Sequence, residues 1–402
     1  MAAVLSTLRS SFSPLRLPNF RIYLGGQAVS LIGTWLQATA QAWVVWELTK
    51  SEGALATVNI LNTLPLLLLG PWAGVWADRL DRRKLLIATQ FGAMLLAFIL
   101  AFLTQTGLTQ LWHVYILATL LGIITALDLP AQQAFLGDLS GMGEVRKAVN
   151  LNAMMLQISR MVGPALAGVL VARIGTAPAF WLNGVTFLAV IASLVAVRAT
   201  QVQSVRDGRN PLRQLGDAVR FISTQPRLQD LFLFAAMMTF FFWAIIFNLL
   251  PSVADTVLGG NAETLGALSG SSGAGALLSI IFVVPLAQAQ KRSGLVVGAA
   301  TLWVGGWILL FSFSEILPLS MASMFLASMG APVVFTMALG LTQVMSPPEM
   351  RARLLSLFTM LSFGMQPVAA LVVGTIAENF GVQTAMTFNA LALIMGAVLI
   401  LI

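Results

Sequence analysis

Two charged residues stand inside long apolar segments, where charges are expensive. Asp128 lies in a segment centred near residue 124, and Arg160 lies in the next one, centred near residue 160. At 1.5 Å per residue, both lie roughly 15–18 Å from the same end of their helices. An unpaired charge at that depth costs several kcal/mol, so matched depth predicts an ion pair. We expect Asp128 to exchange a proton, with Arg160 tuning it. A permanent structural pair is the alternative.

Five polar residues occupy one face of the segment centred near residue 34. They recur at helical spacing, and they are Gln27, Ser30, Thr34, Gln37 and Gln41. A polar amide that faces lipid costs free energy, so this polar stripe must face protein or water. We expect it to line a substrate cavity, and the alternative is hydrogen bonding between helices. Four polar residues of other segments are further candidates for the cavity: Asn62, Gln157, Asn248 and Gln366.

Glycine and proline follow Arg160 on the same segment. Gly163, Pro164 and Gly168 interrupt an otherwise regular apolar pattern. Such residues allow close helix approach or bending in membrane bundles. We expect them to serve conformational change, and an ordinary kinked membrane helix is the alternative.

The composition requires a membrane to surround these segments. Of 402 residues, 58% are hydrophobic and 9% are charged, whereas soluble domains carry about 25% charged residues. A spanning helix needs about 20 apolar residues. Twelve segments qualify, centred near residues 34, 65, 95, 124, 160, 188, 240, 275, 304, 330, 364 and 392. Their length favours helices over a β-barrel.

The net charge of +7 follows the loops and does not indicate nucleic-acid binding. If the N-terminus is cytoplasmic and the segments alternate, 19 of the 22 basic residues fall on the cytoplasmic side. This agrees with the positive-inside rule. It predicts twelve spans with both termini in the cytoplasm and a lipid bilayer around them.

Several classes of chemistry have no sequence support. There is no cysteine, no phosphate loop and no cluster with metal-ligand spacing. No nucleophile and base form a recognisable motif. We therefore expect no cofactor and no metal, a protein that is not an enzyme, and no direct use of ATP.

The chain divides around its longest hydrophilic stretch. We expect an N-terminal six-helix half over residues 1–197, a central cytoplasmic loop over 198–230, and a C-terminal six-helix half over 231–402. Leu212, Leu215, Val219 and Ile222 fall at helical spacing in the loop, which predicts a short amphipathic helix or else an ordinary linker. Gly175 and Asn183 recur 206 residues later as Gly381 and Asn389, which suggests duplicated halves.

These features together carry a resemblance. The loop from Gly74 to Lys84, with its Asp78-Arg79 step and basic cluster, resembles the loop between helices 2 and 3 of the major facilitator superfamily. The sequence from Arg160 to Gly168 resembles the antiporter signature of its exporter branches. Asn19-Phe20-Arg21 and Asp128-Leu129-Pro130-Ala131 are similar to the enterobactin-exporter-like branch.

The resemblance implies an all-α membrane protein with twelve helices in two pseudo-symmetric six-helix halves. It implies a conformational latch made of Gly74, Asp78, Arg79 and Arg83. It also implies a monomeric exporter in the bacterial inner membrane that expels a small amphipathic drug, siderophore or metabolite by proton antiport. The alternatives are a nutrient symporter, a transporter of lipid-like molecules, a membrane sensor or scaffold, and, with least support, an intramembrane enzyme.

Overall fold

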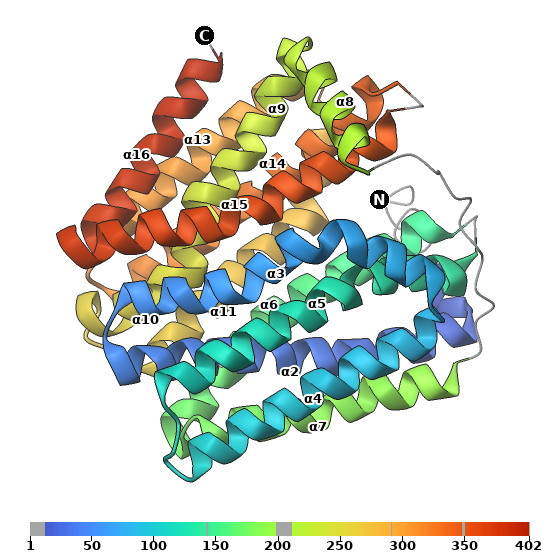
Figure 1. The fold of residues 1–402 in the computed structure, drawn as a ribbon. Coiled ribbons are helices and arrows are strands. Elements are labelled where there is room, and N and C mark those ends of the chain that lie inside the picture. Colours follow the sequence, from blue (N-terminus) through green and yellow to red (C-terminus); the bar gives the residue numbers. More distant parts are fainter. Residues whose placement is uncertain (1–12, 142–143, 198–210, 291, 348–349, 402) are drawn as a thin grey trace.

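The computed structural model describes residues 13–141, 144–197, 211–290, 292–347 and 350–401, and the regular elements in them are helical (Figure 1). The N-terminal half contains η1 (Ser13–Arg16), α2 (Pro18–Thr49), α3 (Glu52–Arg79), α4 (Arg82–Gln105), α5 (Leu111–Ser140), α6 (Val145–Ile174) and α7 (Ala177–Ala196). A connecting helix, α8, spans Pro211–Ser223. The C-terminal half contains α9 (Pro226–Met237), η2 (Met238–Trp243), η3 (Ile245–Leu249), α10 (Leu250–Ser252), η4 (Val253–Val257), α11 (Ala262–Leu278), η5 (Ser279–Val283), α12 (Val284–Gln288), α13 (Ser293–Ser312), α14 (Leu317–Met345), α15 (Arg351–Phe380) and α16 (Val382–Leu401).

The twelve predicted segments are confirmed, because each predicted centre lies in a separate long helical stretch. Among the described residues, eleven stretches are long and apolar enough to cross a membrane. The twelfth, α2, has 32 residues but carries the polar stripe, which lowers its hydropathy. Phe91, Leu95 and Phe102 of α4 are exposed along one face, as expected for side chains that face lipid.

The turn between α2 and α3 is tight. Lys50 ends α2 in the left-handed conformation, with φ of 48°, and its amide donates to the Trp46 carbonyl at 2.8 Å. The Ser51 hydroxyl then accepts from the Ala54 amide at 3.2 Å and caps α3. Such capping satisfies amides that have no partner inside the helix. We call this end of the bundle the Lys50 end, and the opposite end, near η1 and α8, the linker end.

The repeat seen in the sequence has a structural counterpart. Gly175 ends α6 and Gly381 ends α15, and both adopt φ of 87°, a conformation that favours glycine. The two helices that they end have 30 residues each. The same turn therefore follows the fifth spanning helix of each half.

The two halves pack on each other through two helix pairs, α6 with α11 and α3 with α15. A Cβ atom on Gly168 of α6 would lie 2.9 Å from Gly266 Cα of α11. One on Gly374 of α15 would lie 2.9 Å from Ala56 Cβ of α3. Small residues thus allow the backbones of the two halves to approach closely.

The seventh span is the least regular helix. Its stretches η2, η3 and η4 are π-helical, and the short α10 lies between η3 and η4. Wide π turns change the direction in which successive side chains point, and they occur frequently at functional sites. This span supplies Trp243 and Phe247 to the centre of the molecule.

The predicted amphipathic helix after residue 210 exists as α8, which packs against α15. Asp217 of α8 lies 3.5 Å from Arg353 of α15 as an ion pair. Residues 198–210, the first part of the predicted central loop, lie outside the described residues.

Candidate substrate and proton sites

Arg160 lies against a stack of three aromatic rings drawn from both halves. Trp35 of α2 stacks on Phe247 with centroids 6.2 Å apart, and Phe247 stacks on Trp243 at 5.6 Å. The Arg160 guanidinium carbon lies 3.8 Å from the Trp243 centroid and 5.1 Å from that of Trp35. These are cation–π distances, so the stack holds the guanidinium in place.

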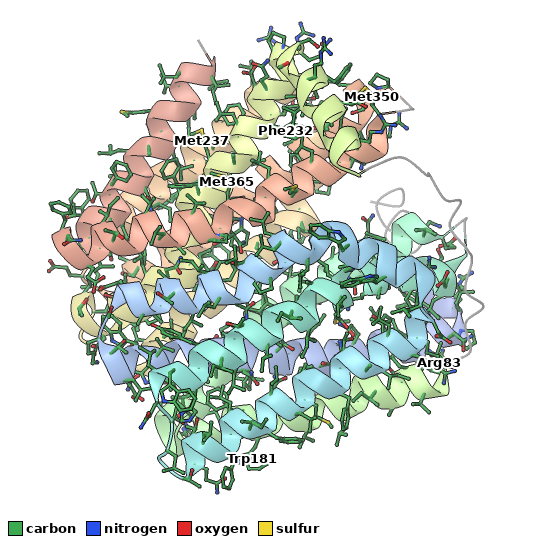
Figure 2. The ribbon with its side chains drawn as sticks, in the orientation of Figure 1. Arg83, Trp181, Phe232, Met237, Met350 and Met365 are labelled. Atoms are coloured by element: carbon green, nitrogen blue, oxygen red, sulfur yellow. The ribbon has the colours of Figure 1, made fainter. Side chains whose placement is uncertain are left out.

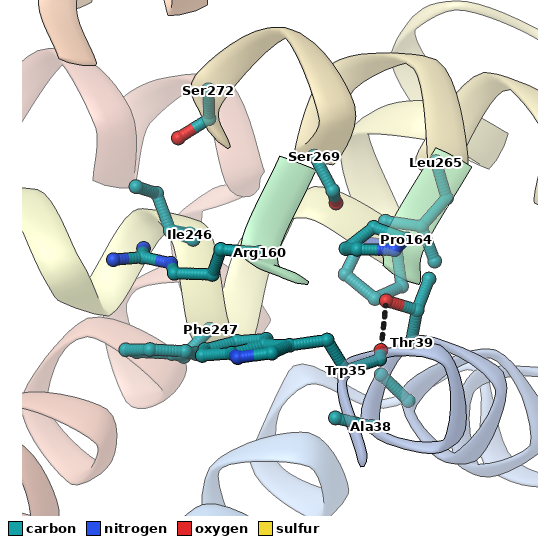
Figure 3. Close-up of a pocket in the computed structure, with 12 residues that line it drawn as sticks. Trp35, Ala38, Thr39, Arg160, Pro164, Ile246, Phe247, Leu265, Ser269 and Ser272 are labelled. Atoms are coloured by element: carbon teal, nitrogen blue, oxygen red, sulfur yellow. Dashed lines mark hydrogen bonds between the residues drawn. The ribbon is translucent and has the colours of Figure 1, made fainter. Parts of the chain in front are cut away.

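A pocket between the halves surrounds this group (Figure 3). Its lining comes from α2, α6, α11 and the seventh span, and comprises Trp35, Ala38, Thr39, Ala42, Arg160, Pro164, Ile246, Phe247, Pro251, Leu265, Ser269 and Ser272. In Figure 3 the Arg160 side chain runs along the Trp35 and Phe247 rings, with Ser269 and Ser272 on its other side. The pocket is therefore apolar on one wall and hydroxyl-bearing on the other.

Asp128 has a different set of neighbours. Its Oδ1 accepts a hydrogen bond from Thr89 Oγ1 at 2.5 Å and one from Gln90 Nε2 at 3.0 Å, both from α4. The predicted ion pair with Arg160 is wrong for this structure: among the described residues, Asp128 is held by neutral donors and Arg160 by aromatic rings. Equal depth fixes the height of two side chains but not the direction in which each points.

The polar stripe of α2 lies largely outside the Arg160 pocket. Gln27, Ser30 and Gln37 are buried, and Gln37 Oε1 accepts from Asn183 Nδ2 of α7 at 2.7 Å. The Thr34 hydroxyl donates to the Ser30 carbonyl. The Gln37 bond fits the alternative, hydrogen bonding between helices, whereas the Thr34 bond lies within α2. The cavity role of the polar stripe stays a prediction. The part of α2 that lines the pocket is instead the neighbouring face, which carries Trp35 and Thr39.

Of the other cavity candidates, Asn248 joins the two halves. It is buried, and its Oδ1 accepts from Asn59 Nδ2 of α3 at 3.2 Å. Asn62 lies one turn farther along α3. Gln157 and Gln27 each have a buried Oε1 with no hydrogen-bond partner in the described part of the chain. The cavity role of these residues, of Gln41 and of Gln366 stays a prediction.

The glycine–proline motif is a packing element between helices. A Cβ on Gly163 would lie 2.6 Å from Trp35 Cβ of α2, and Pro164 lines the Arg160 pocket. Gly168 meets Gly266 across the interface between the halves. The motif thus brings α6 close to both α2 and α11.

Arg83 contacts α7 in the same half, so this structure differs from the predicted latch between the halves. Its Nε donates to the Leu194 carbonyl at 2.6 Å, and its Nη2 donates to the Val195 carbonyl. Cations satisfy unpaired carbonyls at a helix end. Figure 2 shows Arg83 and Trp181 at opposite ends of the α4–α7 pair. The structure does not describe the surroundings of Gly74, Asp78 and Arg79 in the last turns of α3, so their latch role stays a prediction.

The sequence reasoning missed a buried ion pair beside this loop. Arg82, the first residue of α4, donates from Nη1 to both carboxylate oxygens of Asp138 of α5 at 3.0 Å. The two side chains are 6% and 4% exposed. Arg82 stands between Asp81 and Arg83 in the sequence, and such charged surroundings give no sign that one of these side chains is buried.

Polar contacts close the Lys50 end across the two halves. Asp255 of η4 accepts from Lys50 Nζ at 2.6 Å and from Trp46 Nε1 at 2.9 Å. Glu52 accepts from the Ser252 hydroxyl at 2.6 Å, and Glu378 accepts from the Ser51 hydroxyl at 3.2 Å. These contacts join α2 and α3 to the seventh span and α15.

Two six-helix halves around a central pocket define a transporter of the major facilitator type. The chain belongs to the transmembrane secretion effector family, whose model matches residues 9–402. As a member of this family it is a multi-pass membrane transporter and not an enzyme.

Curated relatives include transporters with named cargo. The chain is 28% identical to the staphyloferrin A transporter of Staphylococcus aureus over 249 residues, which span 61% of this chain and only 62% of that protein. It is 25% identical to macrolide efflux protein A of Streptococcus pyogenes over 367 residues, which span 89% of each protein.

Solved structures show the same fold at low sequence identity. A bacterial homologue of the human lysosomal transporter Spinster, in an inward-facing and occupied conformation, gives a TM-score of 0.75 at 13% identity over 97% of both chains. A variant of the nucleoside transporter NupG gives 0.73 at 13% identity over 95% of this chain and 98% of that one.

Proposed function

We propose that this transporter exports a small amphipathic molecule across the bacterial inner membrane in exchange for protons, as a monomer with both termini in the cytoplasm. The name of one relative, macrolide efflux protein A, supports export. Charge placement in the loops supports the orientation.

The observation that carries proton coupling is the Thr89 hydroxyl beside Asp128. Thr89 Oγ1 lies 2.5 Å from Asp128 Oδ1 and 2.9 Å from the Leu86 carbonyl. A hydroxyl has one proton and can accept another hydrogen bond. When Asp128 is ionised, Thr89 donates to it. When Asp128 is protonated, it donates to Thr89, which then donates to Leu86. The same geometry therefore satisfies both protonation states.

Alternating access follows from how the halves meet. The polar contacts among Lys50, Glu52, Asp255 and Glu378 join the halves at the Lys50 end. At the linker end, Figure 1 draws the two halves apart. With the Lys50 end outside, these contacts would hold the halves together on the outer side of the membrane. Rocking of the halves about the α6–α11 and α3–α15 pairs would expose the pocket to the other side.

The test uses purified protein in liposomes with an internal pH dye and an imposed pH gradient. A panel of hydrophobic cations, neutral drugs and siderophore-like compounds is added in turn. We expect at least one compound to move in the direction opposite to protons. If protons and the compound move in the same direction, the protein is a symporter and not an antiporter. Transport of the compound without proton movement would refute proton coupling.

A further inference from the structure

We propose that the Arg160 pocket binds the anionic group of its cargo, of the carboxylate type, with the aromatic stack holding an apolar or aromatic body. This inference rests on the proposed transport function and names the chemical class of its cargo. It gives Arg160 a role in binding cargo in place of the tuning role that the sequence predicts.

The first argument is the way in which the guanidinium is held. The Arg160 guanidinium carbon lies over the Trp243 ring, 3.8 Å from its centroid, and over the Phe247 ring, 5.8 Å from its centroid. Cation–π contact occupies the face of the plane and leaves the N–H donors around its edge free. Those donors match the two oxygens of a carboxylate. A ring stack thus presents the guanidinium without using its hydrogen-bonding capacity.

The second argument is the lack of a counter-ion. Among the residues that the structure describes, Arg160 has no ion pair and no hydrogen bond. Two acids of other spans are engaged elsewhere: Asp128 with Thr89 and Gln90, and Asp255 with Lys50. A charge inside the membrane normally pairs or faces a cavity. Arg160 faces a pocket, so an anion supplied by the cargo would complete the pair.

The third argument is the opposite wall. The Ser269 and Ser272 hydroxyls of α11 line the pocket across from Arg160 (Figure 3). Ser272 Oγ and Ser328 Oγ lie 2.7 Å apart, so one donates to the other. Hydroxyl donors of the C-terminal half and the guanidinium of the N-terminal half would share one bound anion. Binding would then link the two halves, as a transported substrate must.

The probes for the test are 2-naphthoate, its neutral amide and 2-naphthylmethylammonium. They share one ring system and differ in charge. Binding to the purified protein in nanodiscs is followed by ligand-induced change of tryptophan fluorescence, with no pH gradient. We expect the anion to bind about tenfold or more tightly than the amide, because its charge-assisted bonds to Arg160 are stronger, and the cation to bind most weakly.

The variant Arg160→Gln should remove the preference for the anion. Arg173→Gln is the matched control, because Arg173 is exposed at the far end of the same helix. If the wild-type protein binds the anion and the amide with equal affinity, the proposal is wrong whatever the variants show. So would an anion preference that survives in folded Arg160→Gln. Since no proton gradient is applied, a failure here leaves proton antiport standing, and a failure of antiport leaves this result standing.

Discussion

The guanidinium carbon of Arg160, in the N-terminal half, lies 3.8 Å from the centroid of Trp243, in the C-terminal half. The contact crosses the interface that must open and close during transport. Phe247 extends the ring stack to Trp35, so one side chain of α6 contacts rings from both halves. Rearrangement of the halves would change these contacts and therefore the affinity of the pocket.

Loss of the Trp243 ring should weaken cargo binding. Cation–π contact contributes about 0.5–2 kcal/mol, so Trp243→Leu should raise the concentration for half-maximal transport by roughly 2- to 30-fold, whereas Trp243→Phe should retain most of the affinity. Trp112→Leu is the control, because that ring is exposed at the start of α5. If Trp243→Leu and the wild type have the same half-maximal concentration, the ring stack does not contribute to cargo binding.

Removal of the Lys50 charge should shift the population toward states that are open at the Lys50 end. The Lys50 and Asp255 side chains are 55% and 30% exposed, so the pair contributes only about 0–1 kcal/mol, and Lys50→Gln should change the population ratio by a factor of up to about five. The chain lacks cysteine, so labels at Ile174→Cys and Phe313→Cys can report distances at this end. High salt should mimic the substitution in the wild type, and a distance distribution insensitive to both would contradict this role.

A side chain at Gly168 should separate α6 from α11. A Cβ there would lie 2.9 Å from both the Ala262 carbonyl oxygen and Gly266 Cα, and backbone cannot move aside cheaply. We expect Gly168→Leu to cost about 1–3 kcal/mol of stability and to reduce transport. Gly306→Ala is the matched control, since its Cβ would meet open space. Thermal unfolding and flux would be measured together, and a wild-type melting temperature for Gly168→Leu would count against the close packing.

The sequence predicted the helices well and the site partly. Hydropathy located twelve spans because each must bury its backbone polar groups within one helix. Depth along a helix also follows from residue count, which placed Asp128 and Arg160 correctly inside their spans. Their rotation and neighbours depend on how the helices pack, so the aromatic stack around Arg160 and the Thr89–Asp128 bond were not foreseen. Irregular π turns in the seventh span further obscure which side chains share a face.

Neutralisation of Asp138 should destabilise the N-terminal half more than neutralisation of an exposed acid. Asp138 pairs with Arg82 out of solvent, and loss of one member of a buried pair costs about 3–5 kcal/mol. Asp217 pairs with Arg353 but is 63% exposed, so Asp217→Asn should cost about 0–1 kcal/mol. Thermal unfolding of Asp138→Asn and Asp217→Asn in the same detergent compares them directly. Similar losses in both variants would show that burial of the Arg82 pair contributes little.

The measurement that tests the central claim most directly is substrate accumulation by Asp128→Asn in proteoliposomes. The variant keeps a side chain of similar shape beside Thr89 and Gln90 but cannot carry a proton. We predict that it still exchanges substrate across the membrane without a gradient and no longer concentrates substrate when a pH gradient is imposed, while Asp217→Asn behaves as wild type. Gradient-driven accumulation by Asp128→Asn at the wild-type level would contradict proton coupling at Asp128.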